Sequence, residues 1–173
     1  KLSRYICYLI VQNADSGKEV VALGQTYFAI QTRKQEITEQ EYDSLSDDEK
    51  RFYQRKLTKQ GNYTLQKVAS SAGVKNMAEF HNAGYKGLYN GETADDIFKR
   101  KKLRYREDIL DNMGSEELAD NIFRIAQTDA KLKRDNVDNE YTANFIHYEV
   151  GKKVRNTIKE LGGTMPENLP TPE

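Results

Sequence analysis

The stretch "EYTANFIHYEVGKKVRNTIKEL", residues 140 to 161, decides the fold class. Its apolar residues recur at steps of three and four, so they fall on one face of a helix. These residues are Ala143, Ile146, Val150, Val154, Ile158 and Leu161. The opposite face carries aromatic rings together with cations, namely Tyr141, Tyr148, Lys152, Arg155 and Lys159. The pattern predicts an amphipathic helix with one face in a core and the other facing solvent or a partner.

Similar patterns recur along the chain, with signals for helix starts between them. Three capping boxes, in which side chains satisfy backbone N–H groups at a helix start, organise the middle of the chain. They are Thr38 with Glu41, Ser46 with Glu49, and Thr93 with Asp96. Ser115, followed by two glutamates, marks a further start. We therefore predict an all-α fold of about seven helices in a compact, bundle-like arrangement. The expected ranges are roughly 3–13, 17–37, 46–72, 76–84, 93–102, 115–134 and 140–161.

Three stretches depart from this pattern. The β-branched and aromatic run "RYICYLIV", residues 4–11, has the propensity of a strand. Gly84, Gly87 and Gly91, the last preceded by Asn90, could close one small hairpin near residues 85–92. Residues 164–173 follow two helix-stopping glycines and contain all three prolines of the chain. For this segment we expect an extended, poorly packed tail.

The composition bounds the compartment and the class of protein. Twenty-seven cations balance 27 anions, so only local segregation of charge could favour an acidic partner. The single cysteine, Cys7, excludes an internal disulfide and fits a reducing, cytoplasmic location. The apolar run at residues 5–11 is too short to span a membrane and lacks a signal-peptide layout. Because the chain opens on Lys1 and closes on "TPE", we interpret it as a piece of a longer cytoplasmic protein.

Charge is strongly segregated along the sequence. Seven cations and no acid lie between Lys50 and Ala78, whereas residues 36–49 hold seven acids and no cation. The run "FKRKKLRYRED", residues 98–108, sets six cations among eight consecutive residues. Such faces are either solvated helix surfaces or basic, aromatic-studded surfaces for phosphates or an acidic protein. The candidate contact residues are Arg51, Arg55 and Lys59, then Lys101, Lys102 and Arg104, and finally Lys152 and Arg155.

Several polar residues sit on or beside apolar helix faces. We interpret His147 as a hydrogen-bonded residue at the edge of the core, and His81 has no metal-ligand neighbour at helical spacing. Asp129 interrupts an apolar stripe and could pair with Lys133 at i+4. A polar strip on the same helix could form interhelical hydrogen bonds or meet a partner. It consists of Asn121, Arg124, Gln127 and Thr128.

The motifs of common enzymes are missing. There is no Walker loop, no GxGxxG, no HExxH and no cysteine pair, so we assign no catalytic, cofactor-binding or metal-ligating residues and expect no cofactor. One alternative stays open, a metal-dependent nuclease built on Asp129 and Lys131 with an upstream acid such as Asp111 or Asp120. Its position within a predicted helix disfavours it, since no set of residues converges there in named roles.

Four stretches together resemble the DNA-damage-inducible protein D family of bacteria. They are "LSRYICYLIVQNAD", "GQTYFAIQTRKQE", "ILDNMGSEELADNIFRIAQTDAKLKRD" and "VGKKVRNTIKELGGTMPENLPTPE". The opening also resembles the back half of the BRO-type domain of phage antirepressors, a segment expected to be helical. The resemblance divides the chain into residues 1–37 as the back part of a BRO-like domain, 38–163 as the family's helical domain, and 164–173 as a tail.

The resemblance implies a non-enzymatic role in the bacterial SOS response to DNA damage. Family members are associated with binding RecA filaments on single-stranded DNA and with inhibiting or modulating recombination. The implied partners are therefore the RecA filament and single-stranded DNA, with no membrane involved. An antirepressor-like DNA-binding regulatory module is the main alternative, and the exposed amphipathic helices make a homodimer a reasonable expectation.

Overall fold

A computed structural model describes Asp15 and residues 41–172. The chain divides into two compact units, residues 1–46 and 47–173, and the second is described below by itself. The predicted helices at 3–13 and 17–37, the Thr38 capping box, Cys7 and the BRO-like segment are not within the part described. The predicted domain division stays a prediction.

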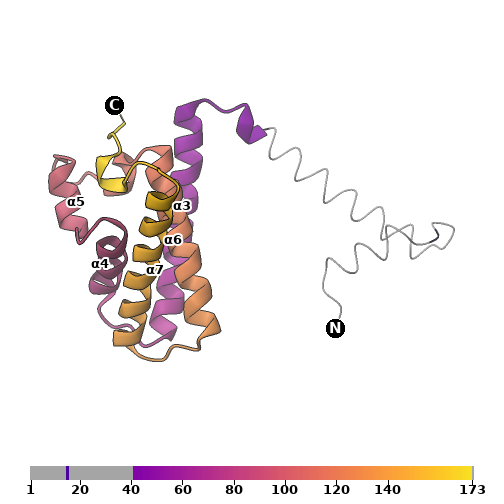
Figure 1. Cartoon of the computed structure of the whole chain (residues 1–173), viewed down its shortest axis with the longest axis vertical. Helices are drawn as coiled ribbons and strands as arrows, with labels where there is room; N and C mark the ends of the chain where they lie inside the picture. The colour runs from indigo at the N-terminus through magenta and orange to yellow at the C-terminus, as the bar shows by residue number, and fades with distance from the viewer. Residues whose placement is uncertain (1–14, 16–40, 173) are drawn as a thin grey trace. The chain divides into compact units, whose positions relative to one another are not determined.

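The described part of the second unit is helical, and residues 41–172 contain no strand. Its elements follow in chain order (Figure 1): α3 (Asp47–Ser71), α4 (Met77–Leu88), α5 (Ala94–Arg100), η1 (Ile109–Asn112), α6 (Ser115–Arg134), α7 (Glu140–Glu160) and η2 (Pro166–Asn168). The all-α prediction is confirmed, and each predicted range from residue 46 onward contains a helix. No helix in this part of the chain has both the length and the apolar character needed to cross a bilayer.

Local capping sets where the helices begin. The Thr93–Asp96 capping box is present as predicted, with both reciprocal hydrogen bonds formed. At α6 the helix starts at Ser115, but Gly114 occupies the cap position and no side chain caps the helix. The carboxylate of Glu140, in the first turn of α7, accepts hydrogen bonds from the backbone N–H groups of Lys75 and Asn76. It thereby ties the start of α7 to the start of α4.

Two helix pairs form the core, since α4 packs along α7 and α3 packs along α6, while α6 also contacts α7. The apolar stripe predicted for α7 enters this core, where Ala143, Ile146, Val150 and Val154 are buried. Leu161 follows the helix end and is exposed, so that member of the stripe was predicted wrongly. The large apolar side chains that are fully buried are Leu65, Phe80, Leu88, Tyr89, Ile97, Met113, Leu118 and Leu132.

The hairpin predicted near residues 85–92 is wrong, because Gly84 and Gly87 lie inside α4. Asn90, with φ +53°, and Gly91, with φ +97°, do have the turn conformation that the sequence led us to expect. The helical glycines serve the packing of α4 on α7. A Cβ built on Gly87 would lie 2.2 Å from the carbonyl oxygen of Tyr148, and one on Gly151 would lie 2.7 Å from that of Gly84. The two backbones therefore touch, with no room for side chains between them.

The C-terminal segment is better packed than predicted. Met165 and Leu169, on either side of η2, are extended, as expected for this Pro-rich stretch. Pro166 is nevertheless buried, and Glu167 binds Arg155 through both carboxylate oxygens, at 2.7 and 2.6 Å. Poor packing is thus the wrong expectation at these two positions, because an ion pair fixes the segment against α7.

We expect the substitution Gly87→Ala to lower the free energy of unfolding by about 3 kcal/mol, because the new methyl group meets fixed backbone atoms. Gly61→Ala in α3 is the matched control. Its Cβ would meet only the Ile125 Cγ2 methyl, at 3.1 Å. The gain of about 1 kcal/mol in helix propensity offsets that contact. Urea denaturation compares the two variants, and equal stabilities would refute the backbone contact between α4 and α7.

Candidate partner-binding surface

The α3 patch, defined as Arg51, Arg55 and Lys59, already carries acidic partners. These are Asp48 for Arg51 at 3.3 Å, Asp111 for Arg55, and both Asp108 and Asp111 for Lys59, at 3.1 and 3.5 Å. Partly exposed pairs of this kind contribute only about 0–1 kcal/mol each, so an anionic partner could displace the acids. The patch nevertheless presents paired charges rather than a free positive field.

The basic run, Lys99 to Arg106, is split between core and surface. The Lys101 side chain is 1% exposed, and its ammonium group donates to Glu117 Oε2 at 2.8 Å and to the Asn112 carbonyl oxygen at 2.9 Å. Lys101 is therefore not available as a surface contact, contrary to the prediction from the sequence. Lys102 is exposed, with φ +54°, and the Arg104 side chain is 91% exposed beside Glu107.

The fold brings the end of the basic run beside α3, but through acids rather than cations. Asp108 and Asp111, which follow the run, are the residues that pair with Arg55 and Lys59. At the other end of the run, Arg100 Nε contacts Glu92 and Arg100 NH1 donates to the backbone carbonyl of Glu167. The basic run and the α3 patch therefore do not merge into one cationic surface.

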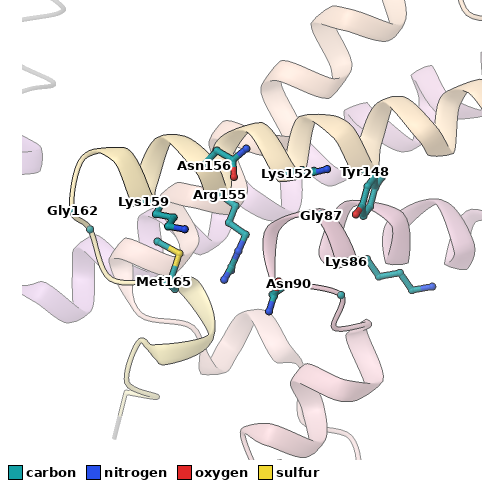
Figure 2. A pocket seen from close by; sticks show the side chains of 12 residues that line it. Lys86, Gly87, Asn90, Tyr148, Lys152, Arg155, Asn156, Lys159, Gly162 and Met165 are labelled. Carbon is teal, nitrogen blue, oxygen red and sulfur yellow. The ribbon is translucent and has the colours of Figure 1, made fainter.

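The third predicted patch, Lys152 and Arg155, lines a groove with a volume of about 640 Å³. Figure 2 shows the successive turns of α7 along one side of this basic groove and Lys86, Gly87 and Asn90 along the other. The C-terminal glycines and Met165 close one end. Cations from α7 and α4 therefore face a common hollow, which the sequence could not show.

Arg155 and Lys152 have different roles in the basic groove. The guanidinium of Arg155 binds the Glu167 carboxylate twice and donates to the backbone carbonyl of Leu88 at 3.0 Å. Those hydrogen bonds raise the pKa of Arg155 and lower the pKa of Glu167. Arg155 is thus part of the wall that holds the C-terminal segment, whereas Lys152 is exposed.

A polar network crosses the core beside the groove. It begins at the buried Lys101–Glu117 pair, and Tyr89 Oη donates to Glu117 at 3.0 Å. The Asn121 amide donates to Tyr89 Oη at 2.8 Å and its oxygen accepts from Arg124 at 3.0 Å. Most of the predicted polar strip on α6 therefore forms buried hydrogen bonds, since Asn121, Arg124 and Thr128 are buried and only Gln127 is exposed.

His147 ends this network as the hydrogen-bonded core residue that the sequence predicted. Arg124 NH1 lies 2.5 Å from His147 Nε2, and because arginine can only donate, that nitrogen accepts. His147 Nδ1 then carries the proton and donates to the Phe80 carbonyl at 2.9 Å. Burial, followed by the charge of Arg124, holds the pKa of His147 well below its usual range. The ring is therefore neutral near pH 7 and is held in a single tautomer.

Arg124 is a buried cation without a carboxylate partner among the residues described. Its guanidinium lies over the ring of Tyr85 at 4.9 Å, and burial lowers its pKa. Burial also disfavours the charged form of Glu117 and so raises its pKa, although the hydrogen bond from Lys101 acts in the opposite direction. His81, which accepts from the Gln66 amide at 3.0 Å, has a pKa lowered to about 4 by burial and then by Arg124.

The alternative nuclease site on α6 finds no support in the geometry. Asp129 pairs with Lys133 at 2.6 Å, which confirms the predicted i+4 contact, and Lys131 pairs with Asp135 at 2.5 Å. Within residues 41–172, no three His, Cys, Asp or Glu side chains are grouped so that they could hold a metal ion. Asp129 and Lys131 are thus engaged in helix-surface pairs, and Asp111 pairs with Arg55 and Lys59 of α3.

Sequence reasoning missed Lys86, Asn90 and Asn156, which line the basic groove, and Phe145 on the same helix as Asn156. Lys86 and Asn90 come from the α4 side, and no local pattern indicates that they meet α7. Phe145 could have been found, because it lies four residues after Tyr141 and three before Tyr148 on the same helical face. It was overlooked because an exposed phenylalanine is unusual on a polar face.

The geometry defines a small all-helical domain with a basic surface groove. The family model for the DinD C-terminal domain matches residues 45–173, and the chain belongs to this family. DNA damage-inducible protein D of Escherichia coli K12 is 54% identical over 176 residues, which cover 99% of this chain and 64% of that protein. This chain therefore spans less than two thirds of its relative. No solved structure matches it. The similarity to BRO-type domains falls on residues 1–37 and stays a prediction.

We expect Lys101→Met to lower the free energy of unfolding by about 3–5 kcal/mol, because it leaves the Glu117 carboxylate buried without its cation. Lys102→Met is the matched control on the adjacent, exposed residue, and we expect it to change stability by less than about 0.5 kcal/mol. Urea denaturation of both variants tests the difference. Similar losses in the two variants would contradict the buried ion pair.

We expect His81 to contribute stability that is present above pH 6.5 and lost as the pH falls toward 4, because its pKa is lower in the folded chain than in the unfolded one. Between about pH 7 and pH 5, His81→Gln should lose about 2 kcal/mol less stability than the unsubstituted chain. Denaturant midpoints measured across this range compare the two. Parallel pH profiles would show that His81 is not held neutral by burial.

Proposed function

We propose that this protein acts in the bacterial response to DNA damage, as a non-enzymatic cytoplasmic protein that binds RecA filaments on single-stranded DNA and modulates recombination. The observation that carries this proposal is the 54% identity, over 99% of the chain, with a protein named DNA damage-inducible protein D. The chain covers 64% of that relative, and the activity is proposed for this chain.

The distribution of charge supports a role in binding. Several cations are exposed and are not consumed by the core, among them Lys102 and Arg104 in the segment after α5 and Lys152 on α7. Such side chains suit the acidic surface of a nucleoprotein filament, whose phosphates dominate its field. The α3 patch could join this contact only by exchanging its present carboxylate partners, and Lys101 is withdrawn from it by burial.

We expect the chain to co-sediment with preformed RecA filaments and to slow strand exchange in their presence. Reversing two exposed charges, with Lys102→Glu and Arg104→Glu, should weaken co-sedimentation several-fold, because attraction to the filament becomes repulsion. Lys56→Glu with Lys153→Glu is the control, since it makes the same change of charge at two exposed positions outside the basic run.

Two results would overturn this proposal. One is the absence of co-sedimentation together with unchanged strand exchange. The other is tight, salt-sensitive binding to duplex DNA without recombinase, which would favour an antirepressor-like regulatory module instead.

A further inference from the structure

One face of α7 exposes aromatic rings that the core does not use. Tyr141 is 82% exposed, Phe145 55% and Tyr148 37%, although the opposite face of the helix is fully engaged in the core. Their spacing of four and then three residues stacks them along one line of the helix. Exposed aromatic rings in a row are costly to keep in water, and such patches commonly mark a binding surface.

The same line continues into cations. Lys152, Asn156 and Lys159 follow at further steps of four, four and three, and they line the basic groove (Figure 2). Lys86 reaches the groove from α4. We name the set Tyr141, Phe145, Tyr148, Lys152, Asn156 and Lys159 the α7 ladder. From Tyr141 to Lys159 it extends about 27 Å, at 1.5 Å per residue.

The lysines of the groove are free to meet an anion. Within residues 41–172, none of Lys86, Lys152 and Lys159 forms an ion pair, in contrast to the α3 patch, where every cation has an acidic partner. The described residues that line the groove include no carboxylate, and Glu167, which binds Arg155 of the groove, is neutralised by that pair. Glu149 and Glu160 lie on α7 but are not among the residues that line the groove.

We propose that the α7 ladder binds single-stranded nucleic acid, with bases stacked on the aromatic rings and phosphates held by the lysines of the groove. A flexible polyanion with exposed flat rings complements both halves of the ladder, because base stacking is tolerant of sequence and phosphates pair with lysine. The regular stacked interior of a duplex hides the base faces that the three rings would contact. This inference rests on the proposed function and assigns the contact with the DNA strand to this chain.

The experiment measures fluorescence anisotropy of a labelled oligothymidylate of about 20 nucleotides with the full chain and no recombinase. The variant Lys152→Glu with Lys159→Glu should weaken binding at least about tenfold and reduce the salt slope by about 0.7 for each lysine–phosphate pair that the substitutions remove. Tyr141→Ala with Phe145→Ala should also weaken it about tenfold, but with an unchanged salt slope. Lys99→Glu with Lys153→Glu is the control of equal charge, and we expect it to bind like the unsubstituted chain.

Each outcome decides the inference separately from the proposed function. Because the substituted side chains are exposed, circular dichroism and urea denaturation should show folded variants. The inference fails if the oligonucleotide does not bind, if both ladder variants bind normally, if a duplex binds equally well, or if a poly-glutamate peptide displaces the strand at equal charge. Binding to RecA filaments without binding to the oligonucleotide would overturn the inference and leave the proposed function intact. If the chain binds the oligonucleotide, the ladder variants lose that binding, and no binding to filaments is found, the inference stands and the proposed function is overturned.

Discussion

The direct contact between the backbones of α4 and α7 is the constraint on which the rest of the second unit depends. Gly87 lies against the carbonyl of Tyr148, and Gly151 lies against the backbone at Gly84 and Leu88. Glycine costs about 1 kcal/mol in helix propensity at each such position, so the sequence keeps it here only because a side chain would separate the helices. The carboxylate of Glu140, which binds two N–H groups at the start of α4, fixes the register of the same pair at one end.

That close approach also explains why polar side chains can lie in the core. At Gly84 a Cβ would come within 2.1 Å of Arg124 NH1 and 2.3 Å of His147 Nε2, so the space that a side chain would fill is occupied by this hydrogen-bonded pair. A buried guanidinium without a carboxylate is expensive to desolvate. Here its cost is offset by two side-chain acceptors and by the face of Tyr85. We infer that the network specifies how α6 packs against α4 and α7, because a shift of any of these helices would leave a buried charge without its hydrogen-bond partners.

Periodicity predicted the helices from residue 46 onward, and the Thr93 capping box fixed one boundary, because both signals are local. The glycines were misjudged for the same reason, since Gly84 and Gly87 look alike whether they permit a turn or a close helix contact. The sequence also does not show which charged side chains form ion pairs in the fold. Lys101 and Lys102 are adjacent and identical, yet the ammonium of the first lies in the core and that of the second in solvent. Only the three-dimensional position of Glu117 distinguishes them.

The neutral composition of the chain hides an unequal distribution of free charge. Asp48, Asp108 and Asp111 pair with the cations of the α3 patch, and Glu167 pairs with Arg155, so structural pairs account for much of the charge that the sequence segregates. Three lysines that form no ion pair within residues 41–172 gather where α4 and α7 meet. The backbone contact at Gly87 and Gly151 holds α7 close to α4. It thereby brings Lys86 to the same groove as Lys152 and Lys159. The contact that packs the core therefore also shapes the surface, because helices held further apart would present these lysines on separate faces.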